Sequence, residues 1–84
     1  MRAAAKWVQR EYHQVVGAAL EAARRKANMT QAELAALLGK PQSVVSGYEA
    51  GKRRVDVVEF LLIVRALGAD PLEIIAEIVR SLPK

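Results

Sequence analysis

The sequence contains no cysteine, a single histidine and few aromatic residues (one Trp, two Tyr and one Phe among 84 residues). The absence of cysteine excludes a disulfide framework and thiolate metal sites. Neither His13 nor any other residue pairs a nucleophile with a base, and there is no glycine-rich phosphate loop, so we expect no enzyme, metal site or cofactor. A chain of this length makes one small domain whose stability must come from its apolar core.

Long apolar runs are also missing. No stretch approaches the roughly 18–20 apolar residues that a membrane-spanning helix requires. The first residues, MRAAAKW, are too short and too interrupted by charge to form a signal peptide. We therefore expect a cytoplasmic protein with no membrane partner.

Positive charge is concentrated in one segment of the chain. Residues 24–54 hold seven lysines and arginines against two glutamates, a net charge of +5, whereas the whole chain has +4. Residues 55–84 have a net charge of −2. A basic segment is either a solvated surface or a site for a phosphate backbone such as that of double-stranded DNA.

Helical periodicity without any β pattern predicts an all-α fold of five helices. The first helix is expected to bury a stripe made of Val16, Leu20, Ala23 and Ala27. Capping residues, glycines and prolines mark the ends of the helices. The expected helices run from a start within 3–14 to about 27, over 31–38, over 42–50, from the Asp56 cap to Gly68, and from the Asp70 cap to Pro83.

The segment TQAELAALLGKPQSVVSGYEAG (residues 30–51) predicts two short helices joined by a tight turn. Thr30 and Glu33 have the spacing of a capping box, and Gly39 supplies a left-handed end for the first helix. In a helix-turn-helix the second helix enters the major groove of DNA. Its outward positions here are Gln42, Ser43 and Ser46, whose short polar side chains can read base edges.

This segment resembles the helix-turn-helix of the Cro and phage-repressor (XRE) family, and the resemblance extends on both sides to cover roughly residues 15–79. The residues that carry the resemblance are Leu20, Ala23, Arg24, Thr30, Gln31, Glu33, Leu34, Ala35, Leu38, Gly39, Gln42, Ser43, Val45, Ser46, Glu49, Gly51, Arg54, Phe60, Leu61, Ala66, Leu67 and Gly68. The resemblance implies a lambda-repressor-like domain over 15–84. Residues 1–14 are then an N-terminal extension with Arg2, Lys6 and Arg10 on one helical face and with Trp7 and Tyr12 as its apolar residues. It either extends the first helix, packs on a dimer partner or forms an arm along DNA, and we expect a packed helical extension of the first helix.

The expected DNA-contacting residues follow from the motif and the resemblance together. Base contacts are assigned to Gln42, Ser43, Val44 and Ser46, with Val44 offering its methyl groups to a thymine methyl. Phosphate contacts are assigned to Gln31, Lys40, Lys52, Arg53 and Arg54. The resemblance also implies an internal ion pair between Arg24 and Glu49.

Two positions depart from the family pattern. Pro41 stands where a serine or threonine often caps the second helix of the motif, so the side-chain cap is lost. Gly47 stands where a longer polar residue often reaches DNA, so one contact is missing and the helix is weakened.

The last two expected helices carry more apolar residues than one small core needs. Helix five has one stripe at Leu72, Ile75, Val79 and Leu82 and a second at Ile74 and Ile78. Because small monomers rarely expose such patches, we expect a homodimer. The interface is assigned to Phe60, Ile63, Ile74 and Ile78.

These observations predict a homodimeric, sequence-specific transcription regulator, a repressor or autoregulator, that binds a palindromic operator. One alternative is an antitoxin that binds a toxin, or another regulatory protein, and regulates its own gene. Another is a protein-interaction module whose DNA binding has decayed, as Pro41 and Gly47 would suggest.

Overall fold

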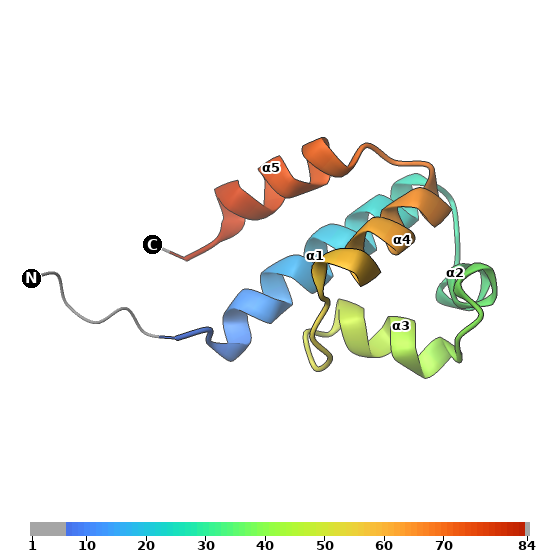
Figure 1. Ribbon diagram of the computed structural model, residues 1–84, viewed down its shortest axis with the longest axis horizontal. Helices are drawn as coiled ribbons and strands as arrows, with labels where there is room; N and C mark the ends of the chain where they lie inside the picture. The colour runs from blue at the N-terminus through green and yellow to red at the C-terminus, as the bar shows by residue number, and fades with distance from the viewer. Residues whose placement is uncertain (1–6, 84) are drawn as a thin grey trace, which may run out of the picture.

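The computed structural model describes residues 7–83, which form five helices and no strand. The helices are α1 (Arg10–Lys26), α2 (Gln31–Leu38), α3 (Gln42–Glu49), α4 (Val57–Leu67) and α5 (Pro71–Ser81), as Figure 1 shows. The predicted all-α, five-helix fold is therefore confirmed. The expected helix bounds hold closely, except that α3 ends one residue early, with Ala50 as its C-cap.

The starts of α2 and α4 are fixed by two capping boxes. At α2 the Glu33 backbone N–H donates to the Thr30 hydroxyl (3.1 Å), and the Glu33 carboxylate accepts from the Thr30 N–H (2.8 Å). Asp56 and Glu59 repeat this arrangement at α4, with distances of 2.7 and 2.9 Å. The backbone N–H groups of Thr30 and Asp56 lower the pKa values of Glu33 and Glu59, respectively. Both glutamates are therefore ionised at neutral pH, which favours these helix starts.

Left-handed glycines end α2 and α4. Gly39 has φ of +67° and Gly68 has φ of +66°, a conformation that L side chains rarely adopt. Both turns allow the chain to change direction within a few residues. The turn after α2 leads directly into α3 and so sets the angle between the two helices of the motif.

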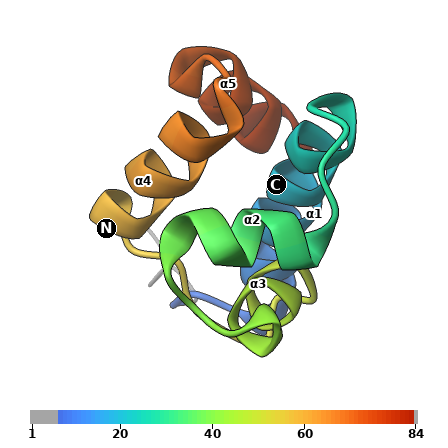
Figure 2. The ribbon, with the colours of Figure 1, turned by 90° about the vertical axis from the view of Figure 1, so that its right-hand side faces the viewer.

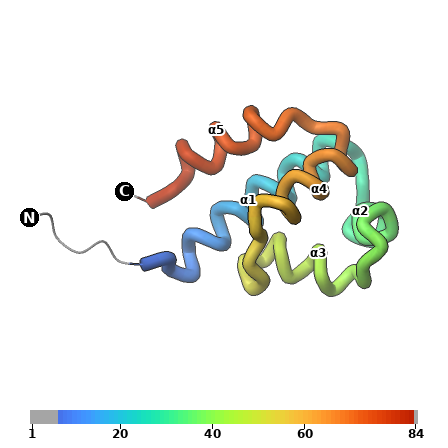
Figure 3. Tube along the Cα trace, in the orientation of Figure 1, coloured from blue at the N-terminus to red at the C-terminus, as the bar shows by residue number. Residues whose placement is uncertain are grey.

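The helices enclose one apolar core. Figures 1 and 2 show α3 at one side of the molecule and α5 at the opposite side, with α1 and α4 between them. The chain trace in Figure 3 shows α5 running back along α1, against which it packs. The core residues are Leu20, Leu34, Ala35, Val44, Val45, Tyr48, Phe60, Ile63, Val64, Leu67 and Ile74.

The core includes residues that the sequence analysis assigned to a dimer interface. Phe60, Ile63 and Ile74 are buried within a single chain, and Ile78 is half-buried against the same core. That assignment is corrected, since side chains enclosed by their own protomer are not available to a partner. The exposed apolar residues of α4 and α5 are the opposite ones: Val57, Val58, Leu61, Leu62, Leu72, Ile75, Val79 and Leu82.

The N-terminal extension matches its predicted form in part where the structure describes it. Residues 1–6, including Arg2 and Lys6, lie outside the described residues. Residues 7–9 precede α1, and Gln9 is its N-cap with an extended backbone. Trp7 is 82% exposed, so it does not pack on its own chain. Residues 10–14 are the first turns of α1, as expected for an extension of the first helix.

Candidate nucleic-acid interface

The outer face of α3 is polar and exposed. Gln42, Ser43 and Ser46 are exposed, and all three come from the first five residues of the helix. Val45 and Tyr48 point the other way and are 1% and 6% exposed. The helix therefore presents short hydrogen-bonding side chains outward and is anchored by apolar ones behind them.

Val44 lies in the core and not on this outer face. Its side chain is buried with Leu20 and Leu34 in the same apolar cluster. The predicted contact between Val44 and a thymine methyl is corrected, because helical geometry turns position 44 away from Gln42 and Ser43.

The backbone of α1 lies directly against the end of α3. A Cβ atom built on Gly17 would overlap the Tyr48 carbonyl oxygen and lie 2.5 Å from that of Glu49, closer than real Cβ contacts. At Gly51, just after α3, a Cβ would lie 2.6 Å from Cγ of Gln14 and 2.8 Å from its Cα. Two glycines therefore permit the close approach that holds α3 on α1.

A buried ion pair joins the same two helices. The Arg24 Nε donates to one Glu49 oxygen (2.6 Å) and its Nη2 to the other (3.0 Å), a two-pronged contact. The Arg24 Nη1 also donates to the Met29 carbonyl (2.7 Å) at the start of the motif. Arg24 and Glu49 are 7% and 8% exposed, and the bond to Glu49 raises the pKa of Arg24 against the effect of burial. Arg24 is thus a structural residue of this site.

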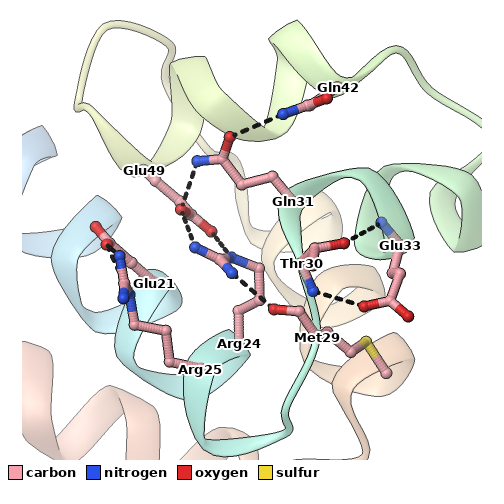
Figure 4. Close-up of polar contacts among 9 residues, drawn as sticks. All are labelled: Glu21, Arg24, Arg25, Met29, Thr30, Gln31, Glu33, Gln42 and Glu49. Atoms are coloured by element: carbon pink, nitrogen blue, oxygen red, sulfur yellow. Dashed lines mark hydrogen bonds and ion pairs between the residues drawn. The ribbon is translucent and has the colours of Figure 1, made fainter.

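Gln31 lies between this ion pair and the outer face of α3, as Figure 4 shows. Its Nε2 donates to Glu49 Oε1 at 2.9 Å, and its Oε1 accepts from Nε2 of Gln42 at 3.4 Å. A carboxylate only accepts hydrogen bonds, so Glu49 fixes which end of the Gln31 amide faces it. Gln31 is half-buried, whereas Gln42 remains exposed beside it.

The four predicted basic contacts are all at the surface. Lys40 lies in the turn before α3, and Lys52, Arg53 and Arg54 follow α3; each is exposed. The Arg53 guanidinium carbon lies 5.7 Å from the centroid of the Tyr48 ring. The structure thus places positive charge at both ends of α3, on either side of its polar face.

Other kinds of site find little support within residues 7–83. No group of three or more metal-ligating side chains occurs in this part of the chain. None of its helices combines the length and the apolar character needed to cross a membrane. A groove between α1 and α5 is lined by alanines of both helices together with the charged residues Lys26, Asp70, Glu73, Glu77 and Arg80.

Sequence reasoning missed two features of this site. Glu49 accepts from Gln31 as well as from Arg24, a contact across 18 residues that no local pattern predicts. The second is the close approach of α1 to α3 at Gly17. The sequence carried a signal for it, because a glycine within a strongly helical segment often marks a close packing contact.

Known proteins match this chain over the whole helix-turn-helix motif and beyond it. A helix-turn-helix family model matches residues 20–74, more than half of the chain. The XRE-family like protein from Pseudomonas syringae pv. tomato str. DC3000 is 41% identical, with a TM-score of 0.74 over 87% of this chain and 89% of that chain. No curated protein matches the sequence.

Two further solved structures share the fold. The clp gene regulator ClgR from C. glutamicum has a TM-score of 0.80 at 26% identity, covering 86% of this chain and 94% of that chain. The restriction-modification controller protein C.AhdI from Aeromonas hydrophila has a TM-score of 0.68 at 34% identity, covering 74% and 94%. The similarity extends over nearly all of each relative.

Proposed function

The chain belongs to the XRE family of helix-turn-helix DNA-binding transcription regulators, and we propose that it acts as a homodimeric, sequence-specific repressor or autoregulator in the cytoplasm. The observation that carries this proposal is the outer face of α3. Gln42, Ser43 and Ser46 stand exposed together on a helix whose opposite side is anchored in the core.

Base reading rests on Gln42. A glutamine amide can form two hydrogen bonds with adenine, accepting from N6 and donating to N7. Gln31 accepts from one Gln42 N–H, so the second N–H and the carbonyl oxygen are left for a base. Ser43 and Ser46 lie on the same face and can bond a base edge or a phosphate oxygen.

Backbone binding rests on charge. Lys40, Lys52, Arg53 and Arg54 flank the reading face, and residues 24–54 hold the net charge of +5. Each phosphate that these side chains neutralise releases counterions, which makes binding weaker as salt increases. Gln31 retains a second amide hydrogen that can reach a phosphate beside the start of α2.

The homodimer is proposed to form through α5. The outer stripe of α5, defined as Leu72, Ile75, Val79 and Leu82, exposes three large apolar side chains at helical spacing and a fourth, Leu82, at the C-cap of the helix. Residues 55–84 carry a net charge of −2, so contact there avoids bringing the two basic segments together. The contact on α5 does not involve α3, so it leaves both reading faces uncovered (Figure 2).

To bind a roughly palindromic operator, the dimer must direct both α3 helices to the same side, into successive major grooves about 34–36 Å apart. Occupying a promoter in this way would block transcription. The relatives whose descriptions name them a regulator and a controller protein support a regulatory role. A toxin or other protein partner would compete for the same outer stripe of α5.

We expect Gln42→Ala to weaken binding to the preferred operator by about ten- to a hundredfold, as expected for loss of a two-bond base contact. The operator would be selected from random duplexes with the wild-type protein, and affinity measured by fluorescence anisotropy at two salt concentrations. Ser81→Ala, an exposed change on α5, serves as the matched control. Equal binding to operator and scrambled duplexes, unaffected by Gln42→Ala, would refute sequence-specific reading by α3.

We expect Val79→Glu to convert a wild-type dimer into a monomer, because it places a charge in the proposed apolar contact. Val79 is 65% exposed within the protomer, so the change should leave the fold intact. Sedimentation velocity would measure the oligomeric state. Val57→Glu, on α4 and 74% exposed, is the matched control and should remain dimeric. A dimer that survives Val79→Glu would rule out the outer stripe of α5 as the interface.

A further inference from the structure

Gly47 has no side chain, and the space beside α3 that a side chain at this position would occupy is filled by the loop that follows the helix. Gly47 lies beside the outer face of α3 and is half-buried. Its carbonyl oxygen accepts the backbone N–H groups of Lys52 (3.0 Å) and Arg53 (3.1 Å), which brings the following loop back against the helix. A Cβ built on Gly47 would lie 3.3 Å from Cβ of Arg53 and 3.8 Å from its Cδ. The Arg53 side chain therefore lies over the space that a residue at 47 would occupy.

The end of this arginine is placed by an aromatic ring. The Arg53 guanidinium lies over the Tyr48 ring, within the distance at which a cation and a ring face attract. The ring is itself held, since the Tyr48 hydroxyl donates to Glu59 Oε2 at 2.8 Å and the side chain is buried. Burial, assisted by the bond to Glu59, raises the pKa of Tyr48 and outweighs the lowering effect of the Arg53 charge, so the hydroxyl stays protonated and keeps donating.

The guanidinium remains available to an external anion. Glu59 is a nearby carboxylate that accepts from Tyr48 and from the Asp56 backbone N–H; its charge attracts Arg53, but the two side chains form no hydrogen bond or salt bridge. Within residues 7–83 the salt bridges join Arg24 to Glu49, Arg25 to Glu21 and Arg80 to Glu77, and none includes Arg53. Arg53 is exposed, so its fork of N–H groups can face a phosphate oxygen.

We propose that Arg53 supplies the charged DNA contact that α3 itself lacks at Gly47, and that Gly47 is a positioning residue that leaves the space for it. This inference rests on the proposed DNA-binding function and names one of its phosphate contacts. The ligand group is a phosphate of the strand beside the groove that α3 enters. Arg53 differs from its neighbours Lys52 and Arg54 in being held against the recognition helix by both Gly47 and Tyr48.

The proposal predicts opposite effects on folding and binding. Gly47→Leu replaces glycine with a better helix former, so the melting temperature should stay level or increase. The added side chain displaces Arg53, so affinity for the wild-type operator should decrease about three- to tenfold. The slope of log affinity against log salt should become shallower by about one unit, as expected for one lost phosphate contact. Gly47→Ala should show the same changes to a smaller extent.

A double-mutant cycle tests whether positions 47 and 53 act through one contact. In an Arg53→Ala background, Gly47→Leu should weaken operator binding no further. Arg54→Ala is the matched control: it removes an equal charge, and its effect should add to that of Gly47→Leu. Additive losses at 47 and 53, or an unchanged salt slope in Arg53→Ala, would overturn the positioning role while leaving DNA binding intact. Failure of the wild-type protein to bind any duplex would overturn both this inference and the proposed function.

Discussion

Gly17→Ala is expected to destabilise the domain by about 3 kcal/mol, the upper part of the range for forcing extra atoms into a packed interior. The new methyl group would overlap the carbonyl oxygens of Tyr48 and Glu49, which belong to the backbone of α3 and cannot rotate away. Alanine normally favours a helix interior over glycine by about 1 kcal/mol, so this clash must exceed a gain in intrinsic propensity. Since small domains are stable by only about 5–15 kcal/mol, the loss would be a large fraction of the total.

Urea unfolding followed by circular dichroism would measure this loss. Ala18→Gly, the neighbouring exposed position of α1, is the matched control, because it exchanges the same two residue types without a contact to α3. We expect it to lower stability by only about 1 kcal/mol, through helix propensity alone. If Gly17→Ala were neutral or stabilising, α1 and α3 could not be as close as the structure places them.

Glu49→Ala is expected to lower the free energy of unfolding by about 3–5 kcal/mol, because it leaves the buried Arg24 guanidinium without its counter-charge. The pair is enclosed, with side chains 8% and 4% exposed, so water cannot replace the lost carboxylate. Gln31 would lose its acceptor in the same variant. The change should therefore also disturb the position of Gln42, which donates to Gln31.

Replacing both partners distinguishes the cost of an unpaired charge from the value of the pair. The double variant Arg24→Met/Glu49→Met should be clearly more stable than Glu49→Ala, because no buried charge remains. The surface pair Arg25–Glu21 gives a comparison, and Glu21→Ala should cost less than about 1 kcal/mol. Equal losses for Glu49→Ala and the double variant would show that the guanidinium is not stranded when Glu49 is removed.

The helix ends were predictable because their signals are local. Thr30 with Glu33, Asp56 with Glu59, and the glycines at 39 and 68 each act within a few residues, and the structure contains all of these features. Such short-range chemistry depends little on the rest of the fold, so the five helices and the motif could be placed from the sequence alone.

Which side of a helix faces inward was harder to predict. Periodicity detected two apolar stripes on α5, but both have helical spacing, so the pattern does not tell which one meets the core. The structure turns Ile74 inward and leaves Leu72 and Val79 exposed, the reverse of the sequence-based assignment. Val44 was misassigned for a related reason, since its neighbours Gln42 and Ser43 do face outward.

Contacts between distant segments were the least predictable. The resemblance implied the Arg24–Glu49 pair, which the structure contains, but the bond from Gln31 to Glu49 depends on how three helices meet. The position of the Arg53 side chain beside Gly47 similarly requires the loop after α3 to fold back against the helix. The spacing of residues along a single helix does not predict such contacts between separate segments.

The two sides of α3 differ in how many substitutions they tolerate. Gln42, Ser43 and Ser46 contact little of the core, so many side chains can replace them without unfolding the domain. Val45, Tyr48 and Glu49 are enclosed and tolerate little change. Mutation can therefore explore new binding preferences at the three outer positions while the scaffold is inherited unchanged, which makes this short helix a natural target for laboratory selection of new specificities.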